Sequence, residues 1–253
     1  MLDKIDIEKL NQISILAGNK ILEVYKQDFE IFTKEDKSPL TLADKKANEV
    51  IVNELEKHYP EIPILSEEGK SIPYEVRKEW EYFWLVDPLD GTKEFIKKNG
   101  EFTVNIALIH NGIPIAGVIY APVLDRLYFA KENQGAFKRE SGKTVRIKGN
   151  KKEKGRALKV VASRSHPSPE LEKYLNTLKI DSFIAIGSSL KLCLVAEGKA
   201  DIYPRLGPTM EWDTGAGHAI LKEAGCGTID VTTEKEMVYN KENLLNNHFI
   251  ASS

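Results

Sequence analysis

The segment Phe83-Trp84-Leu85-Val86-Asp87-Pro88-Leu89-Asp90-Gly91-Thr92 joins a fully apolar run to two acidic residues. An unbroken apolar run is typical of a strand buried on both faces, and Asp87-Pro88 is expected to end it. Pro88 and Gly91 then predict an unusual turn that carries both aspartates. Taken alone, this turn has two interpretations: one acid caps the next helix, or both project functional groups beyond the end of the strand.

The residues that follow this segment predict antiparallel strands. Residues 103–109 and 113–120 are apolar runs joined by Asn111-Gly112, which is the strongest short-range signal of a β-hairpin. Residues 127–130 and 135–137 have the composition of two further strands. The middle of the chain is therefore expected to form an antiparallel sheet.

The residues before the segment predict mainly helices. Residues 13–24 carry apolar side chains at helical spacing, and residues 29–33 are expected to form a short strand. Ser38-Pro39 marks a boundary, because the residue before a proline avoids helical dihedral angles. A second helix is expected after it, with Thr41 as its cap and residues 43–55 supplying its buried face.

After a basic, glycine-punctuated stretch, strand and helix signals alternate. That stretch, residues 148–156, is expected to be a linker or an exposed loop. Three strands and three helices follow, predicted at residues 159–162, 183–186 and 200–203 and at residues 168–178, 189–197 and 211–224. Antiparallel strands followed by alternating strands and helices predict a layered α/β protein with mixed sheets. We expect a single domain of two lobes, about residues 1–155 and 156–253.

Composition narrows the classes of function. Lys and Arg number 36 against 38 Asp and Glu among 253 residues, a net charge of −2, which argues against binding a nucleic-acid polymer. Two cysteines are too few for a disulfide scaffold, and Cys193 is expected to be a buried thiol. The sequence has no apolar run long enough for a transmembrane helix and no signal-peptide pattern, so we expect a cytoplasmic protein.

Further acids are expected near the two aspartates. Glu67-Glu68 follows a short apolar segment, and Asp213 lies in the first turn of a predicted helix. If these acids converge with Asp87 and Asp90, their charges repel one another unless a cation neutralises them. Ligands made only of oxygen suit Mg²⁺, whereas zinc is disfavoured because no cluster of His and Cys has zinc spacing.

Three motifs carry a family resemblance. They are Leu65-Ser66-Glu67-Glu68-Gly69, Asp87-Pro88-Leu89-Asp90-Gly91-Thr92 and Trp212-Asp213-Thr214-Gly215-Ala216. In this order they resemble the inositol monophosphatase-like superfamily of Mg²⁺-dependent phosphatases, which implies a layered αβαβα sandwich of the inositol monophosphatase/fructose bisphosphatase type. Within it, residues 87–95, 163–166 and 187–191 are most similar to 3′(2′),5′-bisphosphate nucleotidases.

The resemblance implies a role for each acid. Two or more Mg²⁺ ions are expected: one bound by Glu67, Asp87 and the carbonyl of Leu89, the other by Asp87, Asp90 and Asp213. Thr92 corresponds to a threonine that orients the attacking water. Asp44 corresponds to its acidic partner, and Glu67 completes the catalytic set. From the residues alone, Asp44 is equally readable as a solvated acid near the start of a helix.

The implied reaction is hydrolysis of the 3′-phosphate of adenosine 3′,5′-bisphosphate, which gives AMP and phosphate and clears a by-product of sulfate assimilation. The alternatives are an inositol- or sugar-phosphate phosphatase with the same metal site and a sensor that binds metal and nucleotide without catalysis. Peripheral association with the inner face of the membrane is also known among relatives. The substrate-binding candidates are Gly91, Thr92, Ser163, His166, Gly187, Ser188, Lys191, Arg205 and Asp213.

Overall fold

The computed structural model describes residues 2–27, 39–151, 155–162 and 169–253. The strand expected at residues 29–33 lies outside the described residues, as do the candidate site residues Ser163 and His166.

The larger sheet has seven strands in the order β1-β2-β3-β4-β5-β6-β7. Their bounds are Ile64–Ser66, Tyr82–Asp90, Thr103–His110, Ile113–Ala121, Arg126–Lys131, Gly135–Glu140 and Lys143–Ile147. Neighbouring strands are antiparallel except β1 and β2, which run parallel. The predicted hairpin is confirmed: Asn111 and Gly112 join β3 to β4 with φ angles of 47° and 76°, the positive values that such a two-residue turn requires.

The smaller sheet has five strands in the order β11-β12-β10-β8-β9. In chain order, β8 to β12 are Leu158–Ala162, Ile180–Ala185, Ile202–Arg205, Gly227–Asp230 and Phe249–Ser252. β8, β9 and β10 run parallel and match the three strands predicted in this half of the chain. β12 is antiparallel to both β10 and β11, and the sequence did not predict these last two strands.

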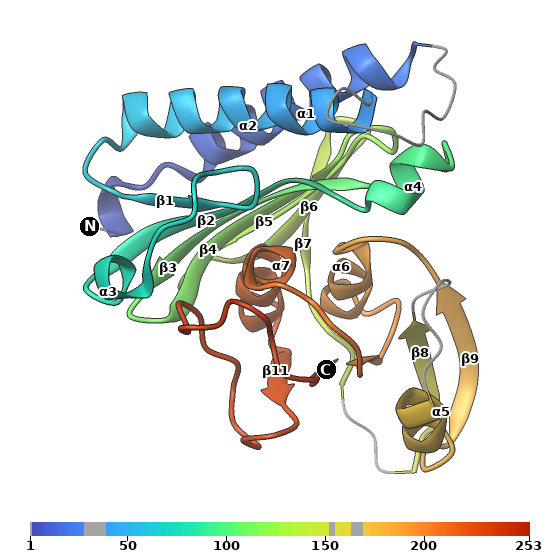
Figure 1. Ribbon diagram of the computed structural model, residues 1–253. Coiled ribbons are helices and arrows are strands. Elements are labelled where there is room, and N and C mark those ends of the chain that lie inside the picture. Colours follow the sequence, from blue (N-terminus) through green and yellow to red (C-terminus); the bar gives the residue numbers. More distant parts are fainter. Residues whose placement is uncertain (1, 28–38, 152–154, 163–168) are drawn as a thin grey trace.

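Helices cover the sheets in layers (Figure 1). α1 and α2 lie along one face of the larger sheet, α6 and α7 lie between the two sheets, and α5 is drawn beside β8 and β9. This order confirms the predicted αβαβα sandwich. The helices are η1 Leu2–Lys4, α1 Ile7–Tyr25, α2 Pro39–His58, α3 Tyr74–Arg77, α4 Thr92–Ile96, α5 Pro169–Leu175, α6 Leu190–Ala196 and α7 Glu211–Glu223.

Two apolar cores hold these layers together. One lies under α1 and α2 and includes Ile13, Ile51 and Trp84. The other surrounds α6 and α7 and includes Ile220 and Cys193, which is a free and fully buried thiol as predicted. Among the described helices, none has the length and apolar character needed to cross a bilayer.

The end of β2 differs from the prediction. The strand does not stop at Asp87-Pro88 but continues to Asp90, and its pairing with β3 shifts register between Asp87 and Asp90. A proline donates no ladder hydrogen bond, and such an irregularity is one of the few places where a sheet tolerates it. The irregularity places both aspartates at the sheet edge, and Gly91 then turns the chain into α4 with φ of +96°.

One local prediction is wrong, and the loop predicted at residues 148–156 is confirmed for its described part, with contacts that the sequence did not predict. α2 begins at Pro39, a favoured first position for proline, so Thr41 lies inside the helix and does not cap it. In the described part of residues 148–156, Asn150 and Arg156 both donate hydrogen bonds to the buried carboxylate of Asp201. This loop is therefore tied to the smaller sheet.

A glycine permits α7 to pack closely on β4. A Cβ atom on Gly117 would lie 2.4 Å from the carbonyl oxygen of Ala216 in α7. We therefore expect Gly117→Ala to destabilise the protein by roughly 1–3 kcal/mol, the usual cost of overpacking. Thermal unfolding should show this as a Tm lower by roughly 3–10 °C.

The matched control is Gly227→Ala in β11, where an added Cβ meets no atom within 4 Å. An equal loss of Tm in both variants would contradict the role of close packing between α7 and β4.

Candidate active site

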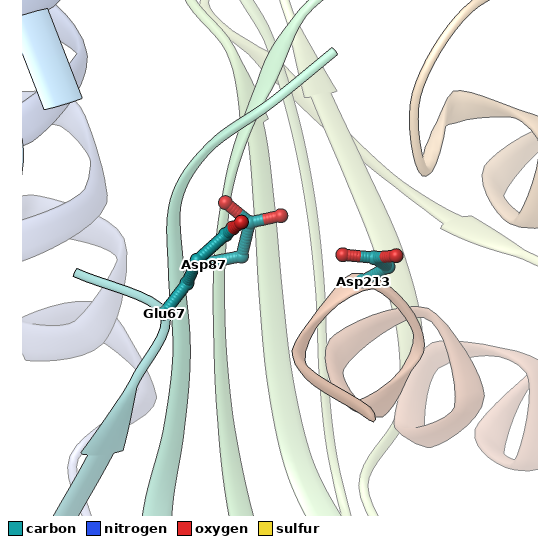
Figure 2. A group of neighbouring side chains, drawn as sticks. All are labelled: Glu67, Asp87 and Asp213. Atoms are coloured by element: carbon teal, nitrogen blue, oxygen red, sulfur yellow. The ribbon is translucent and has the colours of Figure 1, made fainter. Parts of the chain in front are cut away.

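Three carboxylates from separate elements meet at one edge of the larger sheet. Each of Glu67, Asp87 and Asp213 offers an oxygen that lies within 4.8 Å of the others. Figure 2 shows Glu67 and Asp87 side by side, with Asp213 facing them from the first turn of α7. The convergence predicted from the motifs is confirmed for these three acids.

Local structure explains why these side chains meet. Glu67 directly follows β1, which runs parallel to β2, so the carboxyl end of β1 lies beside Asp87. Asp213 is the third residue of α7, and its Oδ2 accepts a hydrogen bond from the backbone N–H of Met210 at 2.9 Å. This bond back to the residue that caps the helix sets the direction of the Asp213 carboxylate.

Burial and mutual repulsion make this cluster electrostatically unfavourable when its acids are ionised. Burial, followed by the charges of Asp90, Glu67 and Asp213, raises the pKa of Asp87 well above its usual range. Burial and the Asp90 charge raise the pKa of Asp213 to about 8. Asp87 Oδ1 accepts a hydrogen bond from the N–H of Leu89, but Oδ2 has no donor among the described residues. A buried acceptor without a partner is what a bound cation would satisfy.

Asp90 lies outside the three-acid cluster. Its Oδ2 accepts a hydrogen bond from the backbone N–H of Ser189 at 2.5 Å, across the gap between β2 and α6. The Ser189 hydroxyl in turn lies 2.8 Å from both Thr103 Oγ1 and Asn105 Oδ1 on β3. Burial also raises the pKa of Asp90. The structure therefore holds Asp90 beside the cluster through α6, a contact that the sequence did not predict.

Asp44 is buried, with 8% of its surface exposed, and lies in the second turn of α2. The interpretation of this residue as a solvated acid is therefore excluded. Burial raises the pKa of Asp44 to about 8, and the charges of Glu68 and Glu67 add to the effect. Asp44 thus belongs to the same electrostatic site as the cluster.

A pocket of about 200 Å³ opens beside these acids. Seven of the predicted site residues line it: Asp90, Gly91, Thr92, Ser188, Lys191, Arg205 and Asp213. The sequence analysis missed other lining residues, among them Lys93, Glu94, Ser189, Leu192, Tyr203, Thr209, Thr214 and Phe249. Gly187 is not among the lining residues, and its N–H donates to Glu101 Oε2 at 2.8 Å.

Three cations line the pocket, and two of them, Lys191 and Arg205, lie on the side of α6 and β10. Lys191 is 7% exposed, its Nζ donates to the carbonyl oxygen of Ser188 at 2.6 Å, and burial lowers its pKa to about 8. The same Nζ lies 5.6 Å from the centre of the Tyr203 ring. Arg205 is held by Thr209 Oγ1 and the carbonyl of Pro208, each at 2.6 Å. The pocket therefore joins an acidic end to a positively charged, partly aromatic wall.

The layered fold and the clustered carboxylates place the chain among metal-dependent phosphatases. It belongs to the inositol monophosphatase family, whose model matches residues 3–253. The family resemblance drawn from the three motifs is confirmed.

Several nucleotidases resemble the chain over nearly its whole length. The 3′(2′),5′-bisphosphate nucleotidase CysQ of Salmonella typhimurium is 50% identical over 228 residues, which cover 88% of this chain and 90% of the relative. The protein of the same name from Escherichia coli K12 is 46% identical over 97% of this chain and 99% of its own. The crystal structure of CysQ from Bacteroides thetaiotaomicron matches with a TM-score of 0.89 and 46% identity, covering 98% of this chain and 96% of that one.

Proposed function

We propose that the chain is a Mg²⁺-dependent phosphatase that hydrolyses the 3′-phosphate of adenosine 3′,5′-bisphosphate to AMP and inorganic phosphate. The observation that carries the proposal is the pocket whose lining contains Asp213 of the carboxylate cluster and Asp90 together with Lys191 and Arg205. Such a lining suits a metal-bound scissile phosphate and a second phosphate. The names of the CysQ relatives support the same substrate.

The residues present fit Mg²⁺. This ion prefers a few carboxylates together with waters and substrate phosphate, and Asp87 Oδ2 is a buried oxygen that lacks a donor. Glu67, Asp87 and the carbonyl of Leu89 would hold one ion, and Asp87, Asp90 and Asp213 would hold a second. When bound, the metal supplies a Lewis acid that lowers the pKa of water and polarises the phosphate.

The remaining catalytic tasks fall to the protein. Thr92 begins α4 and lines the pocket, so its hydroxyl is the proposed group that orients the attacking water. Asp44 is the proposed acceptor of the water proton, with Glu67 beside it, since bound cations would offset the burial and the neighbouring charges that raise its pKa and would leave it ionised near neutral pH. Gly91 allows the turn that brings Thr92 into the pocket.

The far wall of the pocket is the proposed site for the rest of the substrate. Lys191 and Arg205 would bind the 5′-phosphate, since charged donors form the stronger hydrogen bonds to phosphate. Tyr203 and Phe249 also line this wall, where they are almost fully buried and their rings pack edge to face with centres 5.9 Å apart. The proposed substrate is therefore a small nucleotide. The cytoplasmic location of the protein stays a prediction.

A substrate panel tests the proposal. Phosphate release would be measured from adenosine 3′,5′-bisphosphate, inositol 1-phosphate, fructose 1,6-bisphosphate and AMP, each with Mg²⁺ and with EDTA. We expect the nucleotide bisphosphate to be preferred and EDTA to abolish release. If inositol 1-phosphate were preferred, the proposed function would change from a nucleotidase to an inositol phosphatase. No release from any substrate, with nucleotide binding retained, would identify a sensor.

Removing either cation tests how the 5′-phosphate is recognised. Lys191→Met keeps much of the buried volume and Arg205→Gln keeps a polar group, but each removes one charge. A charge-assisted contact contributes roughly 1.5–3 kcal/mol, so KM for adenosine 3′,5′-bisphosphate should rise about 10- to 150-fold.

The control substrate for both variants is 3′-AMP, which lacks the 5′-phosphate and should be hydrolysed almost as by the unmodified enzyme. An equal loss on both substrates would assign these residues to the reaction centre or to folding.

A further inference from the structure

A chain of hydrogen bonds supports the first turn of α7. It begins at Asp213, whose Oδ2 accepts from the N–H of Met210 at 2.9 Å. The carbonyl of the same residue, Met210, accepts from Asn246 Nδ2 at 2.9 Å. Asn246 therefore holds the residue that in turn holds the Asp213 carboxylate.

Both polar atoms of the Asn246 side-chain amide are hydrogen-bonded. It is 5% exposed, and its Nδ2 also donates to Thr214 Oγ1 at 3.0 Å. Its backbone N–H donates to the carbonyl of Thr209 at 2.8 Å, and its Oδ1 accepts from Lys241 Nζ at 3.1 Å. A buried amide with all of its groups paired has one orientation, so it can transmit a fixed position to its partners.

A second branch secures the Thr214 hydroxyl. Thr214 Oγ1 donates to the carbonyl of Glu211 at 3.1 Å and accepts from the hydroxyl of Tyr239 at 3.3 Å. The ring of His218 holds Tyr239 in place, because its Nδ1 lies 3.1 Å from that hydroxyl and its Nε2 lies 3.0 Å from Glu236 Oε1. Residues of the segment between β11 and β12 thus form hydrogen bonds with the first and second turns of α7.

These hydrogen bonds can fix the orientation of the Asp213 carboxylate within the cluster. The charges of Asp90 and Glu67 repel Asp213 and favour a carboxylate that turns away from them. A metal site needs its ligands oriented before binding, and groups behind the ligands commonly supply this orientation. We propose that Asn246 and Tyr239 are positioning residues that aim the Asp213 carboxylate at the bound metal. This inference rests on the proposed metal site.

The test compares direct metal binding in four variants of the full chain. Asn246→Leu removes both donors of the amide at nearly constant volume, and Tyr239→Phe removes only a hydroxyl. Asn11→Leu, in α1 under the opposite face of the sheet, and Tyr128→Phe, on β5, are matched controls because both are buried residues outside this network. Calorimetric titration with Mg²⁺ gives Kd, thermal unfolding gives Tm, and kinetics give kcat and KM.

One hydrogen bond is worth about fivefold in affinity, so Tyr239→Phe should raise the Kd for Mg²⁺ about fivefold and Asn246→Leu about 25-fold. KM at saturating Mg²⁺ should stay within about twofold, and the control variants should leave Kd unchanged even where they lower Tm. Equal shifts of Kd in a variant and its control would overturn the inference, as would a lower Tm with unchanged Kd.

Metal binding also separates this inference from the proposed function. If the unmodified protein binds Mg²⁺ but does not hydrolyse adenosine 3′,5′-bisphosphate, the substrate assignment fails and the comparison of Kd values still decides the role of Asn246. A protein that binds no Mg²⁺ would overturn the metal site and the positioning role together.

Discussion

Asp87→Asn is expected to lower kcat by at least about 1,000-fold at saturating Mg²⁺. Asp87 is the buried member of the carboxylate cluster, and its Oδ2 has no hydrogen-bond partner among the described residues. Replacing the carboxylate by an amide removes the negative charge that this oxygen would offer to a metal. A metal contributes several kcal/mol to stabilising the charge of the transition state, and each 1.36 kcal/mol corresponds to a tenfold change in rate. Steady-state phosphate release measures the loss.

The same substitution should raise the stability of the metal-free protein. Burial and the charges of the neighbouring acids disfavour an ionised Asp87, so a neutral amide of the same shape removes that cost at any pH high enough to ionise the carboxyl. Loss of activity with a higher Tm in EDTA would distinguish a lost ligand from a damaged fold. Asp181→Asn, at an exposed position on β9, is the control and should change neither quantity. Near-normal turnover of Asp87→Asn would contradict the proposed metal site.

The second large effect concerns the stability of the metal-free protein as a function of pH. The pKa values of Asp44 and Asp213 are raised to about 8, whereas an unfolded chain has aspartate pKa values near 3.9. Between about pH 4 and pH 8 the folded state therefore binds more protons than the unfolded state. The free energy of unfolding must fall as pH rises through this window, by up to about 1.4 kcal/mol per pH unit for each group.

Thermal unfolding in EDTA should show this as a Tm that drops by on the order of 10 °C between pH 5 and pH 8. Mg²⁺ should reverse the drop at pH 8, because it binds the ionised carboxylates of the folded state only. Asp213→Asn should flatten the profile, because it removes one of the acids whose pKa is raised. A metal-free protein whose Tm is constant or rises over this range would refute the electrostatic description of the site.

Local signals predicted much of the fold. Asn111-Gly112 specified a hairpin because few residue pairs accept two positive φ angles, and both angles are positive in the structure. The end of β2 was misjudged because Pro88 normally stops a strand, and only the shifted pairing with β3 lets the strand continue to Asp90. β12 was missed because its pairing with β10 and β11 depends on residues distant in the sequence.

In the site too, residues within sequence motifs were predictable, whereas residues that act through long-range contacts were not. The motif residues Glu67, Asp87 and Asp213 were predictable because each lies in a recognisable segment, and the structure brings them together. The contributions of Ser189 and Asn246 were not predictable from the sequence. These residues act through hydrogen bonds to groups that are distant in the chain. The roles assigned to Thr92 and Asp44, and the division into two lobes, stay predictions.

The long separation between the parts of the pocket bears on how the protein is made. The bond from Ser189 to Asp90 joins residues 99 positions apart, and the cluster needs Asp213, which lies near the end of the chain. During synthesis the N-terminal part of a chain emerges first and begins to fold first. A ribosome-bound chain can therefore pair β1 with β2 while α7 has yet to be made. It then holds Glu67 and Asp87 without Asp213, so phosphatase activity cannot begin before α7 has been made.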